Sequence, residues 1–151
     1  MVRFRFRLEA SLRLAEQTLE TAQREFAQEA QRLEVCVKAC AIQQRRFNEA
    51  LEGQREAGRQ RPEELGLWQI FAFEQKGRLH QCELKRVEQE PVMENARRLL
   101  FEAHREVEKF QRLKEKQNKA FLVAELQKEQ KVLDETGQVL HWRQQSESIR
   151  N

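Results

Sequence analysis

The stretch that decides the fold is GQREAGRQRPEELG, residues 53–66. It contains three of the five glycines and one of the two prolines of the chain: Gly53, Gly58, Gly66 and Pro62. Such a cluster of helix-breaking residues marks a turn. A proline followed by two glutamates is typical of the first turn of a new helix, where acidic side chains complement the helix dipole. We therefore predict a turn at about residues 58–63 between two helices.

The residues before this turn carry one apolar stripe with the period of a helix. In steps of three and four it runs through Phe4, Leu8, Ser11, Ala15, Leu19, Ala22, Phe26, Ala30, Leu33, Val37, Cys40, Gln44, Phe47 and Leu51. This stripe predicts a first helix over about residues 3–57. The opening RFRFRL, residues 3–8, alternates with the period of a strand, but the alternation stops there. We interpret it as the first helical turn or as a short arm leading into the helix. Phe4 and Leu8 then lie on the stripe and Phe6 lies off it.

A second stripe follows the turn and predicts a helix over about residues 64–140. It runs through Trp68, Ala72, Gln75, Leu79, Cys82, Arg86, Gln89, Met93, Ala96, Leu100, Ala103, Val107, Phe110, Leu113, Gln117, Phe121 and Ala124. The stripe is most polar at Arg86 and Gln89. Pro91 lies beside them, so we expect a kink or a break near residues 87–91. Gly137 is expected to end or fray this helix.

These two helices predict an all-α fold, a single antiparallel coiled-coil hairpin over residues 1–151. Reflection about the turn makes the numbers of facing residues add up to about 120, so residue 4 is expected to face residue 116. Residues 117–140 then form an overhanging C-terminal helix of about 35 Å. Its apolar side chains are Phe121, Leu122, Val123, Leu126, Val132, Leu133, Val139, Leu140 and Trp142. An uncovered apolar helix indicates a binding partner, with fraying or self-association as the alternatives.

Composition and charge limit the function classes. The chain has 28 Lys and Arg against 25 Asp and Glu, a net charge of +3, and a mean hydropathy of −0.87. The basic surplus is local to Arg3, Arg5 and Arg7, which form either a solvated arm or a contact for an acidic partner surface. No face gathers the basic charge that nucleic-acid binding requires, so we expect no nucleic-acid partner. No stretch approaches the length of a membrane span, and we expect a soluble, cytoplasmic protein.

No arrangement of residues predicts catalysis or a cofactor, so we expect a protein that is not an enzyme. The one candidate for a metal is a cluster of four residues, Cys36, Cys40, His80 and Cys82, which the hairpin brings together and which could hold zinc. Cysteine is also a small apolar residue that suits a helical seam, and we favour this second interpretation.

Aromatic and aliphatic residues crowd the start of the second helix. Trp68, Ile70, Phe71 and Phe73 span more than one helical face, so they cannot all contact the first helix. Two interpretations stay open. In one, they cover the turn; in the other, one face of the cluster binds another protein.

Two short motifs near the ends of the chain carry a family resemblance. The first is the basic and aromatic opening FRFRLE, residues 4–9. The second comprises EKFQRLKEK, residues 108–116, followed by EQKVLDE, residues 129–135. Together with the length and the hairpin, they make the chain resemble the FliJ family of the bacterial flagellar export apparatus.

The resemblance implies a non-enzymatic stalk, similar to the stalk of rotary ATPases. The expected partners are a hexameric flagellar export ATPase, whose assembly and hydrolysis the stalk promotes, a transmembrane export gate protein and export chaperones. It implies a cytoplasmic location at the inner face of the membrane, held there through protein partners. The equivalent stalk of a virulence-type secretion system and a generic coiled-coil scaffold are the alternatives.

The resemblance also implies two contact sites. The export gate is expected to contact the start of the second helix, at Trp68, Phe71, Gln75 and Arg78. The ATPase ring is expected to contact the end that carries both termini, at Arg3, Phe4, Arg7, Phe121, Leu126 and Leu133.

Overall fold

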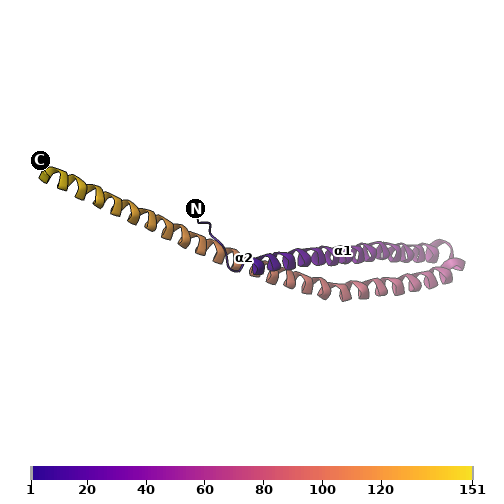
Figure 1. The fold of residues 1–151 in the computed structure, drawn as a ribbon. Helices are drawn as coiled ribbons and strands as arrows, with labels where there is room; N and C mark the ends of the chain where they lie inside the picture. Colours follow the sequence, from indigo (N-terminus) through magenta and orange to yellow (C-terminus); the bar gives the residue numbers. More distant parts are fainter. Residues whose placement is uncertain (1, 151) are drawn as a thin grey trace. The chain divides into compact units, whose positions relative to one another are not determined.

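The computed structural model describes residues 2–150 and is helical almost throughout (Figure 1). Helix α1 spans Glu9–Gln60, the 3-10 turn η1 spans Pro62–Glu64, and helix α2 spans Leu65–Arg150. The two long helices pack antiparallel as a hairpin, which confirms the predicted fold class. The chain divides into two compact units, one of residues 16–105 and one of residues 2–15 with 106–150.

The turn forms where glycine and proline cluster. Helix α1 ends at Gln60, and the Arg61 N–H donates to the Ala57 carbonyl at 2.8 Å. Pro62 opens η1, and the Glu64 N–H donates to the Arg61 carbonyl at 3.0 Å. Because proline has no N–H to donate, it fits a first turn, where that donor has no helical partner. The chain therefore leaves one helix and enters the next within four residues, Arg61 and η1.

The core of the unit of residues 16–105 is narrow. Its buried apolar residues are Ala22, Ala50, Ala57, Ala72, Leu79, Ala96 and Ala103. Alanine at these positions lets the two helix backbones approach closely, and the larger seam residues beside them stay half-buried. Such a core is consistent with the low mean hydropathy of the chain.

Facing residues confirm the predicted reflection. In the pairs Gly53 with Trp68, Gln43 with Gln75, Glu29 with Gln89, Phe26 with Arg97 and Glu9 with Lys114, the two residue numbers add up to between 118 and 123. The turn alone therefore sets which parts of α1 and α2 meet.

The predicted stripe of α1 is wrong by one residue over one segment. Val37 and Gln44 are exposed, and Cys36 and Gln43 occupy the seam in their place. Gln43 lies inside because its amide donates to the Gln75 Oε1 at 2.6 Å. A buried amide is tolerated when it is hydrogen-bonded, which allows Gln43 to occupy the seam where the predicted stripe had Gln44.

The predicted stripe of α2 is confirmed from Trp68 to Leu113, where every member is buried or half-buried. Helix α2 does not break at Pro91 and does not end at Gly137 or residue 140. Pro91 is exposed and lacks only the one N–H that would reach the Val87 carbonyl. The exposed Gly137 costs a helix about 1 kcal/mol, which is too little to end one of 86 residues.

In the unit of residues 2–15 and 106–150, the chain begins as a non-helical arm, residues 2–8, rather than as helix from residue 3. Phe6 is buried at 7% exposure and Leu8 is 39% exposed, so the expected roles of these two residues are reversed. Three arginines at a helix N-terminus would oppose the helix dipole, whereas Glu9 at that position complements it. The strand-like alternation of the opening therefore belongs to the arm.

The arm also covers more of α2 than predicted. Phe4 contacts Phe121, with ring centroids 5.7 Å apart, rather than a residue near 116. An extended chain advances about 3.3 Å per residue and a helix about 1.5 Å, so the arm reaches further along α2 than a helical turn would. The uncovered part of α2 begins after Glu125, which is the last half-buried residue.

Candidate partner-binding surfaces

The last part of α2, residues 126–150, is exposed at every position, and we call it the tail. Its large apolar side chains are Leu126, Val132, Leu133, Val139, Leu140, Trp142 and Ile149. A helix that buries none of its apolar residues gains nothing from them in the free chain. The tail is therefore a candidate binding surface.

The apolar residues of the tail lie on two faces. Leu126, Leu133 and Leu140 repeat every seven residues and so form one stripe. Val132, Val139, Trp142 and Ile149 form a second stripe. At about 100° per residue, the two stripes lie roughly a third of a turn apart. One flat partner surface would cover only one of them.

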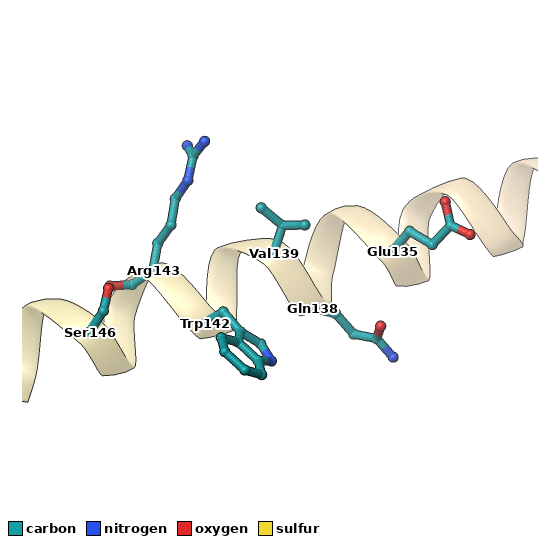
Figure 2. Close-up of a pocket in the computed structure, with 6 residues that line it drawn as sticks. All are labelled: Glu135, Gln138, Val139, Trp142, Arg143 and Ser146. Atoms are coloured by element: carbon teal, nitrogen blue, oxygen red, sulfur yellow. The ribbon is translucent and has the colours of Figure 1, made fainter.

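Figure 2 shows the second stripe around Val139 and Trp142. Val139 and Arg143 line one edge of a shallow hollow on this face of the helix, and Gln138 and Trp142 line the other edge. Glu135 and Ser146 complete this shallow hollow, and the Trp142 indole is 76% exposed. One helix supplies the whole lining, so a partner would have to provide the other wall.

The arm fixes a basic surface in the same unit as the tail. Phe4 contacts Phe121 of α2 and Phe6 is buried, whereas the alternating Arg3, Arg5 and Arg7 are exposed. Glu9 Oε2 pairs with Lys114 Nζ at 2.9 Å, just after the arm. Of the six residues expected to contact a ring, Phe4 and Phe121 cover each other in part, and the other four are exposed.

The residues expected to contact an export gate lie in the other unit and do not share one surface. Gln75 is only 4% exposed and is held by Gln43. Trp68 is half-buried against Gly53. Its ring and that of Phe71 form an edge-to-face pair with the ring centroids 5.9 Å apart. Only Phe71 and Arg78 are exposed. Trp68 therefore packs against α1 close to the turn, whereas Ile70, Phe71 and Phe73 are exposed.

The sequence analysis missed a second apolar stripe on the outward side of α2. Its positions are Ile70, Phe73, Gly77, His80, Leu84 and Val87, and we call it the outer stripe. All six residues are exposed, Phe73 at 80%. They alternate in steps of three and four, which is a visible signal. It was missed because the sequence analysis followed only the longer inward stripe of the same helix.

The three cysteines are free thiols, and Cys40 lies close enough to Cys82 for their charges to interact. Burial raises the pKa of the Cys40 thiol, and Cys82 raises it further. Within residues 2–150, no group of three or more His, Cys, Asp or Glu side chains is placed to hold a metal ion. The structure therefore gives the zinc hypothesis no support.

Over residues 2–150, no helix combines the length and the apolar character needed to cross a bilayer. The fold and the exposed surfaces define a coiled-coil protein of the helical-hairpin class. The family model described as "Flagellar FliJ protein" matches residues 5–146. The chain belongs to the FliJ family, whose members are non-catalytic components of the flagellar export apparatus. No curated protein and no solved structure matches the chain.

Proposed function

We propose that this protein is the stalk of a flagellar export ATPase. In this proposal the tail and the arm bind in the centre of the hexameric ATPase and promote its assembly and ATP hydrolysis. The start of α2 contacts the transmembrane export gate, and the protein also takes part in the handling of export chaperones. The virulence-type alternative is less favoured because the matching family is a flagellar one.

The observation that carries the proposal is the exposure of both tail stripes. Two apolar faces a third of a turn apart are best covered by a partner that surrounds the helix. The central hole of a ring is such a partner, whereas a single groove would leave one stripe in water. Each leucine that becomes buried contributes about 1.5–3 kcal/mol, so a few of them suffice for specific binding.

The arm adds a charge requirement to this site. Arg3, Arg5 and Arg7 are exposed, in the unit that contains the tail. A hole lined by carboxylates or carbonyl oxygens would complement them. The proposal therefore predicts that binding to the ring weakens as the salt concentration rises.

The gate contact is proposed for the outer stripe together with Phe71 and Arg78. Phe73 is the most exposed large apolar residue of the hairpin unit, and aromatic residues are frequent anchors in protein interfaces. Gln75 is left out because it is buried between the helices. This surface lies in the unit of residues 16–105, so the ring and gate contacts use different units.

The direct test is ATP hydrolysis by a purified flagellar export ATPase during titration with this protein. Ring formation is followed in parallel by sedimentation. We expect stimulation that saturates near one copy per hexamer. A protein that changes neither hydrolysis nor ring formation would favour the generic scaffold instead.

A matched pair of variants tests the tail. Leu126→Asp removes an apolar contact and introduces a charge, and we expect the concentration for half-maximal stimulation to rise at least tenfold. Gln127→Asp introduces the same charge at the adjacent exposed position and should have little effect. Equal effects of the two variants would show that charge, and not the leucine stripe, matters.

A further inference from the structure

The outer stripe has the spacing of a coiled-coil seam. Ile70, Gly77 and Leu84 repeat every seven residues, as do Phe73, His80 and Val87, which follow them by three. The stripe is about 26 Å long. It faces away from α1, because the α2 residues that face α1, such as Ala72 and Leu79, lie on nearly the opposite side of the helix.

Antiparallel pairing with a second copy places complementary side chains opposite each other. With the two-fold axis midway between Gly77 and His80, Ile70 faces Val87 of the second copy, and Phe73 faces Leu84 of the second copy. Gly77 then faces His80 of the second copy, so the smallest member of the stripe makes room for an imidazole. The two outer pairs thus bring apolar side chains together, and a small residue faces a larger one only at the centre of the stripe.

The charges beside the stripe select this orientation. One edge carries Gln69, Lys76, Glu83 and Glu90. In the antiparallel arrangement this edge meets itself, so Lys76 lies across from Glu83 of the second copy, and symmetry repeats the pair. In a parallel arrangement, Glu83 would instead lie beside Glu88 of the second copy, and the two carboxylates would repel.

Both charges are available for such a contact. Lys76 and Glu83 are exposed, and in the described residues 2–150 neither forms an ion pair within its own chain. Their neighbours differ, because Glu74 pairs with Arg78 and Glu90 pairs with Arg86. Since Lys76 and Glu83 are two helical turns apart, they do not meet each other in one chain.

We propose that two copies of this protein associate through the outer stripe, with the two α2 helices antiparallel. This self-association does not depend on the proposed role in export. The seam has six positions per chain and is far smaller than a standard interface, so the dimer is weak and forms with rising concentration. A segment or protein that binds the outer stripe competes with the dimer.

Sedimentation equilibrium of the full chain, with reductant to exclude disulfides, tests the proposal. We expect a reversible dimer. Lys76→Glu and Glu83→Lys should each weaken it about tenfold, because each replaces two attractive pairs by two repulsive ones. The double variant Lys76→Glu with Glu83→Lys restores the opposite charges and should recover the affinity of the unmodified chain.

Two controls make the result specific. Lys85→Glu changes the net charge as Lys76→Glu does, but lies away from the stripe and its edges, so the dimer should persist. Phe73→Ser should abolish the dimer while circular dichroism shows unchanged helicity. A monomer at all concentrations would overturn the proposal. So would a dimer that Phe73→Ser leaves intact, which would point to the tail, or charge effects that do not compensate in the double variant.

Discussion

The turn end of the hairpin offers a sharp test, because two glycines of α1 have opposite surroundings. The indole of Trp68 lies on Gly53, where an added methyl group would overlap three ring carbons. At Gly58 the nearest atom to an added methyl is the Leu65 Cδ1 at 3.8 Å, an ordinary contact. Both glycines are helical. Gly53→Ala and Gly58→Ala therefore differ only in what the methyl meets.

The magnitudes follow from these contacts. In a helix, alanine is favoured over glycine by about 1 kcal/mol, and both variants receive this gain. At Gly53 the indole must move, which costs about 1–3 kcal/mol as overpacking. Its edge contact with Phe71 contributes a further 0.5–1.5 kcal/mol that is then lost. We expect Gly53→Ala to lower the free energy of unfolding by about 0.5–3.5 kcal/mol, and Gly58→Ala to raise it by about 1 kcal/mol.

Urea unfolding followed by far-ultraviolet circular dichroism measures both changes, and melting temperatures should differ by roughly 5–10 °C. A Trp142→Phe background leaves Trp68 as the only tryptophan, so its fluorescence reports the displacement of the indole directly. Equal stability of the two alanine variants, with unchanged Trp68 emission, would refute the assigned packing of Trp68 on Gly53.

Three further perturbations probe the hairpin. Gln43→Leu should destabilise it by about 1–3 kcal/mol because the buried Gln75 amide loses its partner, and adding Gln75→Leu should recover part of the loss in urea unfolding; additive losses would contradict this coupling. Pro91→Ala restores one backbone hydrogen bond and should raise the melting temperature by several degrees; an unchanged value would show that α2 is not continuous there. The raised pKa of Cys40 predicts slower alkylation at mildly alkaline pH than in the urea-unfolded chain; it also makes stability fall as pH rises through the unfolded thiol pKa toward the folded one, a decline that Cys40→Ser should lessen.

Much of the fold was predictable because the decisive signals are local. The helix-breaking residues between Gly53 and Gly66 locate the turn. Once the single turn of a hairpin is located, the numbers of facing residues must add up to a constant. A single apolar stripe does not determine whether its next member lies three or four residues further along the helix. After Leu33 the next seam residue is Cys36 and not Val37, and packing against the opposite helix decides between the two.

The candidate surfaces were predictable to a smaller degree. The exposed leucines of the tail were predicted because no partner helix remained for them. A short arm was one of the two interpretations of the opening, but the burial of Phe6 was not predicted, because Phe6 lies off the helical stripe of the sequence. Gln75 was assigned both to the inward stripe and to the gate contact; its burial confirms the first assignment and removes it from the second.

The small core of the hairpin has a mechanical consequence. Its buried apolar residues are mostly alanines, and no large side chain of residues 2–150 is completely enclosed. Each turn of helix is therefore held mainly by the turns directly beside and across from it, so the hairpin behaves as a one-dimensional array with nearest-neighbour coupling. Opening at one end should spread only a short distance. A partner that binds one segment of the hairpin can then unfold or stabilise that segment without changing the free energy of unfolding of segments farther along.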